Sequence, residues 1–151
     1  MSLKLKVPPA VVFLICIGMM WALDQQIPEW FVIDLGKLLP RGILALGVLI
    51  GLVGVFQFAR SSTSVDPHHP EKASVLVTSG VYRFSRNPMY LAMLLILLGG
   101  FIKFGEPTGL VVLIFYLWYM NRFQIQPEEE MMEEKFGKEF REYKKSVRRW
   151  I

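Results

Sequence analysis

Residues 88–120 read PMYLAMLLILLGGFIKFGEPTGLVVLIFYLWYM, and this stretch decides the fold. It holds two apolar runs, Pro88–Ile102 and Pro107–Met120, separated only by Lys103–Glu106. A helix that crosses a bilayer needs about 20 mostly apolar residues, and basic residues that flank a shorter run extend it by placing their charges at the interface. A linker this short permits only a tight turn, so the sequence predicts an antiparallel hairpin of two membrane helices.

Two further apolar runs precede this hairpin, at Val7–Leu23 and Gly42–Ala59, and each is long enough to span a bilayer. The chain of 151 residues is 53% hydrophobic and 20% charged, with a mean hydropathy of +0.39. Soluble domains are about 45–50% apolar and about 25% charged. None of the four runs alternates with the two-residue period of a barrel strand. The sequence therefore predicts an all-α integral membrane protein with four transmembrane helices and a C-terminal amphipathic interfacial helix.

A chain of this length is one domain. We expect a single membrane domain over residues 1–151, with a cytoplasmic loop at 60–87, spans at about 7–23, 42–59, 88–104 and 107–122, and a C-terminal helix at 127–149. The first run follows two lysines, as a signal peptide would, but Met19, Met20 and Trp21 are poor cleavage-site residues, so a retained helix is favoured. The single cysteine, Cys16, excludes an internal disulfide framework.

The placement of Lys and Arg orients the four spans. With the N-terminus in the cytoplasm, fourteen of the seventeen Lys and Arg residues lie inside, and only Lys37, Arg41 and Lys103 lie outside. This asymmetry obeys the positive-inside rule. Both termini are therefore expected in the cytoplasm. The loop at 60–87 and the tail after Arg122 then meet at the same face of the membrane.

The tail has the pattern of a basic amphipathic helix. Pro127 suits the first helical position, and the carboxylates that follow it suit the positive end of a helix dipole. Apolar residues recur at helical spacing at Met132, Phe136, Phe140, Tyr143, Val147 and Trp150. Such a helix beside a bilayer is typical of an interfacial segment that contacts membrane lipid. The inside rule already explains the positive charge, so we expect no nucleic-acid partner.

The third span begins with a pattern that favours an anion site. Asn87 is a good N-cap and Pro88 a good first helical residue. A helix N-terminus flanked by Arg83 and Arg86 attracts a carboxylate or phosphate. Two plainer interpretations stay open: the pair at 87–88 only starts a helix, and the two arginines only contact lipid phosphate.

Taken together, these segments resemble two motifs of one family. GVYRFSRNPMYL at 80–91 resembles the G-x-Y-R-x-x-R-H-P-x-Y signature of the isoprenylcysteine carboxyl methyltransferase family. EEEMMEEKFGKEFREYKKSVRRWI at 128–151 resembles that family's second signature, E-E-x-x-L-x-x-x-F-G-x-E-Y-x-x-Y-x-x-x-V-x-R. The family belongs to the phospholipid methyltransferase superfamily, and the short chain resembles its small prokaryotic members. The resemblance covers about 90 residues and implies an integral protein of a prokaryotic inner membrane.

The resemblance implies a cytoplasm-facing site for S-adenosylmethionine, with S-adenosylhomocysteine as product. The cofactor-binding residues that it implies are Tyr82, Arg83, Arg86, Asn87, Pro88, Tyr90, Glu128 and Glu129. Glu129 is also a candidate catalytic residue, because a carboxylate favours the sulfonium charge. Arg122 is the second, as a group that holds an anionic part of the substrate, although it also suits a plain anchor at a helix end. Asn87 departs from the family's His, so this position cannot take up a proton.

The methyl acceptor is not readable from the chain. The resemblance implies a lipophilic small molecule or lipid-modified substrate, which carries an isoprenylcysteine-like carboxylate, a lipid amine or a thiol. Two other functions stay open: an NADPH-dependent membrane reductase of related fold, and a non-enzymatic membrane protein whose basic tail binds lipid or a partner. Asp66, His68 and His69 lie on a Pro-flanked loop that favours solvated side chains, so no metal site is expected. Oligomeric state is left open.

Overall fold

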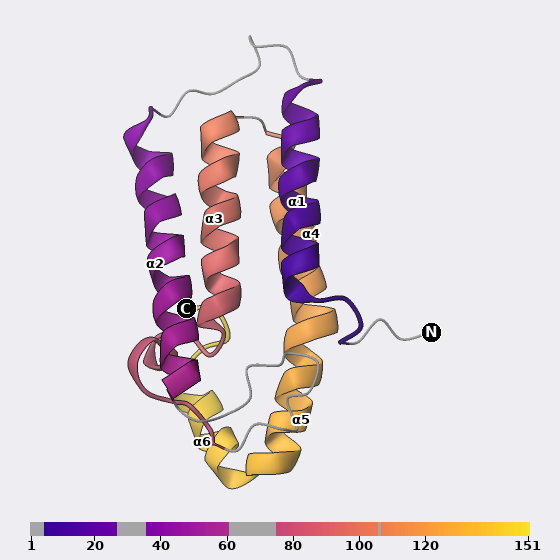
Figure 1. Ribbon diagram of the computed structural model, residues 1–151. Coiled ribbons are helices and arrows are strands. Elements are labelled where there is room, and N and C mark those ends of the chain that lie inside the picture. The colour runs from indigo at the N-terminus through magenta and orange to yellow at the C-terminus, as the bar shows by residue number, and fades with distance from the viewer. Residues whose placement is uncertain (1–4, 27–35, 61–74, 106) are drawn as a thin grey trace.

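The computed structural model describes residues 5–26, 36–60, 75–105 and 107–151, and the described residues form helices and no strands. The elements are α1 (Pro9–Asp24), α2 (Leu38–Arg60), the 3-10 turn η3 (Gly80–Arg83), α3 (Pro88–Phe104), α4 (Gly109–Tyr119), the π-helical segment η4 (Met120–Ile125), α5 (Gln126–Phe136) and α6 (Lys138–Ser146). The prediction of an all-α fold is confirmed for these residues. Helices α1 to α4 stand side by side, and α5 and α6 form a hook at one end of them (Figure 1).

A stripe of small residues on α2 sets how closely it packs on α3. A Cβ atom added at Gly47 would lie 2.9 Å from the backbone oxygen of Ala92, and one added at Gly51 would lie 3.2 Å from the Cβ of the same alanine. The approach is equally close at the other end, where a Cβ at Gly99 would lie 3.1 Å from the backbone oxygen of Pro40. Small residues allow helices in a membrane to approach closely and gain dispersion contacts. These glycines therefore serve helix packing.

The main core lies between α1, α3 and α4, where Cys16, Leu97, Val112 and Tyr116 are almost fully buried. The outer faces of the helices carry large apolar residues, among them Leu14, Trp21, Leu52, Phe56, Val111 and Trp118, all more than half exposed. Helix α2 is long and apolar enough to cross a membrane, and α1 and α3 are apolar but shorter. Exposed apolar surface of this extent is typical of a protein that contacts lipid.

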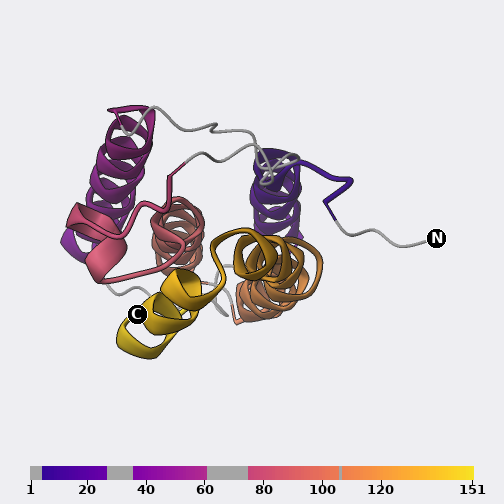
Figure 2. The same cartoon turned by 90° about the horizontal axis from the view of Figure 1, so that it is seen from below.

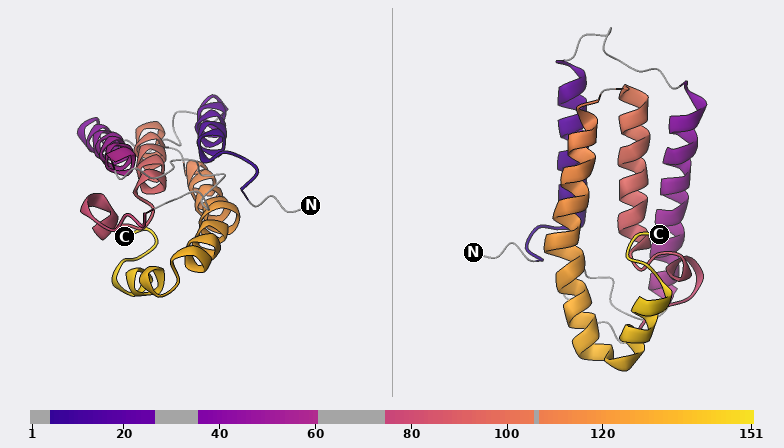
Figure 3. Two further views of the ribbon diagram at one scale, coloured as in Figure 1. Left: turned by 60° about the horizontal axis from the view of Figure 1, so that its bottom comes forward. Right: turned by 180° about the vertical axis from the view of Figure 1, so that it is seen from behind.

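The C-terminal helix predicted at 127–149 is wrong as a single element. Gly137 has a φ of 53°, which side-chain-bearing residues rarely adopt, and it divides the segment into α5 and α6. Helix α6 ends at Ser146, and Val147 is extended. We call residues 147–151 the C-terminal strap. The hook folds back, so that the strap lies beneath α3 (Figure 3).

The helical backbone runs on from α4 through η4 into α5, because the residues at both junctions keep right-handed helical angles. The fourth apolar helix therefore passes directly into the acidic start of the tail. The predicted apolar stripe survives the break at Gly137. Met132 and Phe136 pack with Phe140, Tyr143 and Val147 in a second, smaller cluster, which Leu76 completes. The last residue of the stripe, Trp150, packs on the main core instead.

Candidate functional site

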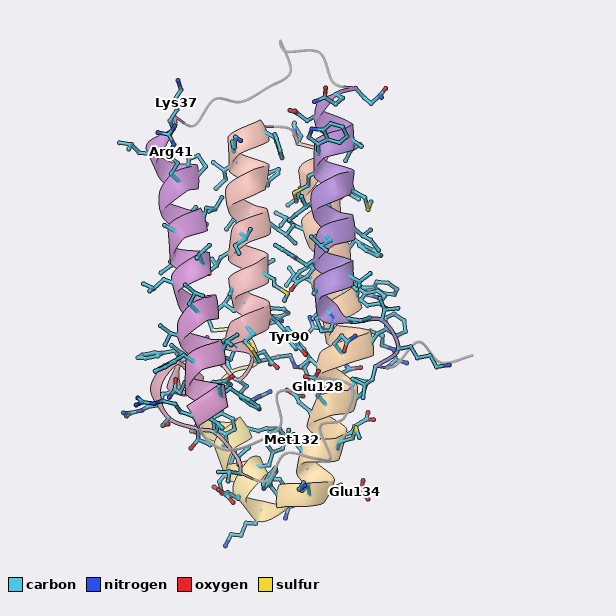
Figure 4. The ribbon with its side chains drawn as sticks, in the orientation of Figure 1. Lys37, Arg41, Tyr90, Glu128, Met132 and Glu134 are labelled. Carbon is cyan, nitrogen blue, oxygen red and sulfur yellow. The ribbon has the colours of Figure 1, made fainter. Side chains whose placement is uncertain are left out.

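The two motif segments meet at one end of the bundle. Seen from below, η3, the start of α3, α5, α6 and the C-terminal strap lie together around this end (Figure 2). Lys37 and Arg41 lie at the opposite end of α2, far from Tyr90 and Glu128 (Figure 4). The site therefore lies at the end of the bundle that also carries the basic tail.

Glu129 lies between two arginines from distant parts of the chain. Arg86 Nη2 donates to Glu129 Oε1 over 2.7 Å, and Arg149 Nη2 donates to Glu129 Oε2 over 2.6 Å. The side chains of Arg86 and Glu129 are only 11% and 15% exposed. Burial alone would raise the pKa of Glu129, but the hydrogen bonds from Arg149 and Arg86 outweigh it and lower that pKa. Glu129 is therefore held as an anion with both oxygens occupied.

Arg86 also joins the start of α3 to the end of α6. Its Nη1 atom donates to the backbone oxygens of Lys144, over 3.1 Å, and Val147, over 2.7 Å. These are carbonyls at a helix C-terminus, where the dipole favours a cation. The Arg86 backbone N–H donates to the backbone oxygen of Arg148 over 3.0 Å. Arg86, a residue of the first motif, therefore contacts α5, α6 and the C-terminal strap, which all belong to the second motif.

Asn87 occupies the N-cap position of α3, as predicted, but its side chain makes no capping hydrogen bond. Instead its Nδ2 atom donates to the backbone oxygen of Arg149 over 2.9 Å. On its other side the strap contacts η4, where Asn121 Oδ1 accepts from Arg149 Nη1 over 3.2 Å and from Trp150 Nε1 over 3.3 Å. The strap is therefore held between the start of α3 and the π-helical segment.

Glu128 has a different environment from its neighbour. Tyr90 Oη donates to Glu128 Oε1 over 2.5 Å, and Figure 4 shows the two side chains pointing toward each other from α3 and α5. Tyr116 Oη donates to the backbone oxygen of Tyr90 over 3.2 Å, which fixes this part of α3. Burial raises the pKa of Glu128 to about 8, and the negative charge of Glu129 adds to the rise, against the opposing hydrogen bond from Tyr90.

Several buried polar atoms at this end are without a partner. Within the described part of the chain, Tyr82 Oη, Tyr119 Oη and Arg86 Nε are buried and make no hydrogen bond. Tyr143, for which the sequence favours packing, donates from its Oη to the backbone oxygen of Tyr82 over 2.6 Å and so fixes η3. Buried polar atoms without partners are uncommon in native proteins and often mark the position of a ligand or an ion.

The structure brings together most, but not all, of the predicted site residues. Pro88 is the buried first residue of α3 and contributes no side-chain hydrogen bond. Arg83 is exposed at the end of η3. Arg122 is exposed in η4 and donates to Gln126 Oε1 over 3.2 Å. No group of three possible metal ligands occurs among the described residues, and Asp66, His68 and His69 lie outside them.

Sequence reasoning missed Arg149 and Asn121. Arg149 is the final Arg of the second motif, and this was the one signal that pointed to it. Asn121 follows an apolar run and carries no motif; only the folded chain brings it against the strap.

The chain is similar in sequence to several known proteins. The family model described as phospholipid methyltransferase matches residues 37–139. The chain therefore belongs to the phospholipid methyltransferase family. It is 31% identical over 118 residues to a probable protein-S-isoprenylcysteine O-methyltransferase of Oryza sativa subsp. japonica, covering 78% of this chain and 60% of the rice protein. It is 31% identical over 105 residues to the protein-S-isoprenylcysteine O-methyltransferase of Saccharomyces cerevisiae, covering 70% of this chain and 44% of the yeast protein.

A further relative is an uncharacterized protein of Haemophilus influenzae, which is 44% identical over 63 residues, covering 42% of this chain and 100% of that protein. No solved structure matches. The chain spans 60% or less of the length of the rice and yeast methyltransferases. The similarity to them therefore concerns a shared part of longer proteins.

Proposed function

We propose that this protein transfers a methyl group from S-adenosylmethionine to a lipophilic acceptor at the cytoplasmic face of a membrane. The observation that carries the proposal is the pair of salt bridges that Glu129 forms with Arg86 and Arg149; the one with Arg86 joins the first motif to the second. Two segments 43 residues apart, at Arg86 and Glu129, thereby contribute to one polar site. The family to which the chain belongs and the names of its curated relatives support the same chemistry.

The residues at this end fit S-adenosylmethionine. The buried Arg86 Nε is a donor that suits a carboxylate, and the buried phenols of Tyr82 and Tyr119 suit hydroxyl or amino groups. Glu129 supplies a fixed negative charge, and Glu128 supplies a second one only when it is ionised, so the pair suits a cationic ligand. When bound, S-adenosylmethionine supplies a methyl group on a positively charged sulfur and leaves as S-adenosylhomocysteine. The chain's own part is to orient the reactants and to exclude water, which accounts for most of the rate in such a transfer.

We infer that Tyr82, Arg83, Arg86, Asn87, Pro88, Tyr90, Glu128 and Glu129 line the cofactor site, and that Arg122 holds an anionic part of the acceptor. Within this set Asn87 acts indirectly, because its amide already holds the strap that carries Arg149. Glu129 likewise acts through the arginines that it fixes. The exposed guanidinium of Arg122 lies one residue from Asn121, which contacts the strap, so an acceptor held there would lie beside the site.

The proposal includes a membrane arrangement with α1 to α4 as the four spans and both termini in the cytoplasm of a prokaryotic cell. Its support is the charge distribution along the bundle. Lys37 and Arg41 lie at one end, whereas the site and the basic tail lie at the other (Figure 4). Exposed basic residues of α6, among them Lys138, Arg141 and Lys145, then face anionic lipid at the inner leaflet.

Calorimetric titration of the purified protein in detergent tests the proposal. We expect S-adenosylhomocysteine to bind and NADPH not to bind; the reverse result would support a reductase, and binding of neither would support a non-enzymatic membrane protein. Glu129→Gln should weaken binding of S-adenosylhomocysteine about tenfold or more, since both arginines lose a charged partner. Glu134→Gln is the matched control, because Glu134 is exposed on the same helix and points away from the site (Figure 4).

A further inference from the structure

Two adjacent carboxylates of α5 have opposite environments. Both oxygens of Glu129 accept from guanidinium groups, so this residue stays ionised. Glu128 has one hydrogen-bond partner among the described residues, the uncharged phenol of Tyr90, and none of the described cations contacts it. Where the environment moves the pKa values of two neighbouring acids in opposite directions, one acid stays an anion and the other can take up and release a proton.

The position of Glu128 is fixed from two helices. Tyr90 comes from the first turns of α3 and holds Oε1, while Tyr116 of α4 holds the backbone of Tyr90. The carboxyl group therefore lies where the apolar part of the bundle meets the polar site (Figure 4). A lipophilic acceptor that enters between the helices would present its polar end here.

Burial and the negative charge of Glu129 favour the protonated form of Glu128, whereas the hydrogen bond from Tyr90 favours the anion. Tyr90 of α3 contacts Glu128 directly, whereas Tyr116 of α4 and Tyr82 of η3 act on Tyr90. On α5 itself Glu129 adds a negative charge. Arg86 and Arg149 are both bound to the neighbouring Glu129. Burial raises the pKa of Glu128 to about 8, and Glu129 adds to the rise against the hydrogen bond from Tyr90. This value is close to the pKa of about 8.5 for the thiol of a free cysteine.

We propose that Glu128 is the proton acceptor of the reaction, and that the methyl acceptor is a nucleophile that arrives with its proton, a thiol or an amine, rather than a carboxylate. This inference rests on the proposed function. A carboxylate nucleophile is ionised at neutral pH and needs no base, so it would leave Glu128 without a role in proton transfer. A thiol or an ammonium group must lose a proton before its electron pair can attack.

The step balances with this residue as the base. The proton of the thiol or ammonium passes to the free oxygen of the Glu128 carboxylate. The electron pair left on sulfur or nitrogen forms the new bond to the methyl carbon. The bond between that carbon and the donor sulfur breaks, and its electron pair stays on the donor sulfur, which becomes neutral. Glu128 then releases its proton to solvent.

The experiment measures methyl transfer from labelled S-adenosylmethionine in micelles to three amphiphiles: dodecanethiol, dodecylamine and N-acetyl-S-farnesylcysteine, which offers a carboxylate. We expect transfer to the thiol or the amine, with kcat rising through about pH 8 as one proton dissociates. Glu128→Gln should lower kcat by about 100-fold or more, whereas Glu134→Gln should match the wild type. Preferred transfer to the carboxylate, with Glu128→Gln as active as the wild type, would overturn the inference and leave the proposed function intact.

Tyr90→Phe provides a second variant. The Tyr90 hydrogen bond lowers the pKa of Glu128, so its loss should move the pH profile of kcat to higher pH. Infrared difference spectroscopy gives a readout independent of turnover: the carbonyl band of a protonated carboxylic acid should be present at about pH 7 and absent in Glu128→Gln. An unshifted profile, or a band that Glu128→Gln retains, contradicts the role of Glu128. Absence of S-adenosylhomocysteine binding would instead refute the proposed function, and the inference with it.

Discussion

Replacement of Arg86 by Met should destabilise the protein more than any other single change at the site. The guanidinium makes three hydrogen bonds, one to Glu129 and two to carbonyls at the end of α6. The substitution leaves those groups with fewer partners in a region where Arg86 is only 11% exposed. Loss of one partner from a buried ion pair costs about 3–5 kcal/mol. Because Glu129 keeps Arg149, we take the lower end, about 3 kcal/mol.

The assay is thermal unfolding of the purified protein in detergent, followed by tryptophan fluorescence. For a chain of this length, 1 kcal/mol corresponds to about 2–4 °C in Tm, so the expected fall is about 6–12 °C. Arg86→Lys should lower the Tm by about half as much, since an ammonium group keeps the charge but cannot reach three acceptors in the same geometry.

Arg83→Met is the matched control, because the Arg83 side chain is exposed and makes no hydrogen bond or ion pair with the described residues. It removes the same charge from the same motif and should leave the Tm nearly unchanged. If Arg86→Met melts within about 2 °C of Arg83→Met, the two motifs are not joined by this network, and the account of the site is wrong.

Three further predictions follow the same reasoning. Gly47→Ala should cost about 1–3 kcal/mol of unfolding free energy, because its Cβ would lie 2.9 Å from a backbone oxygen of α3; Gly42→Ala, with no described atom within 4 Å of the new Cβ, should not lower the Tm. Arg149→Met should lower both the Tm and the calorimetric affinity for S-adenosylhomocysteine, whereas Arg148→Met, at an exposed neighbour, should change neither. Because the pKa of Glu128 is raised in the folded state, the stability that Glu128 contributes should be complete below about pH 4.5 and be lost as pH rises toward about 8. The Tm of the wild type should therefore fall across this range relative to the Tm of Glu128→Gln. Parallel curves of Tm against pH would refute the raised pKa.

Features that depend on a few neighbouring residues, such as helix starts, are predicted well from the sequence. Asn87 and Pro88 mark the start of the third helix, and α3 begins at Pro88 as predicted. Apolar composition and spacing likewise indicate the all-helical fold. The break at Gly137 was missed because the apolar residues on both sides of it keep helical spacing. The turn depends on the positive φ of Gly137, which the spacing of apolar residues does not indicate.

The site depends on contacts that no local pattern records. Glu128 and Glu129 are indistinguishable in the sequence, yet one meets a phenol and the other two guanidinium groups. The basic residue Arg149 fits an exposed tail, and its pairing with Glu129 arises because Gly137 turns the chain back. Asn87 fits a helix cap, but its amide holds the C-terminal strap. Long-range placement, rather than residue type, decides these roles.

Hydrogen exchange with mass spectrometry tests the central claim most directly. Addition of S-adenosylhomocysteine to the full chain in detergent should slow amide exchange in peptides from both 80–91 and 128–151, and leave peptides from the far end of α2, around Lys37 and Arg41, unchanged. Protection confined to one of the two segments, or absent from both, would contradict the claim that they bind a single ligand together.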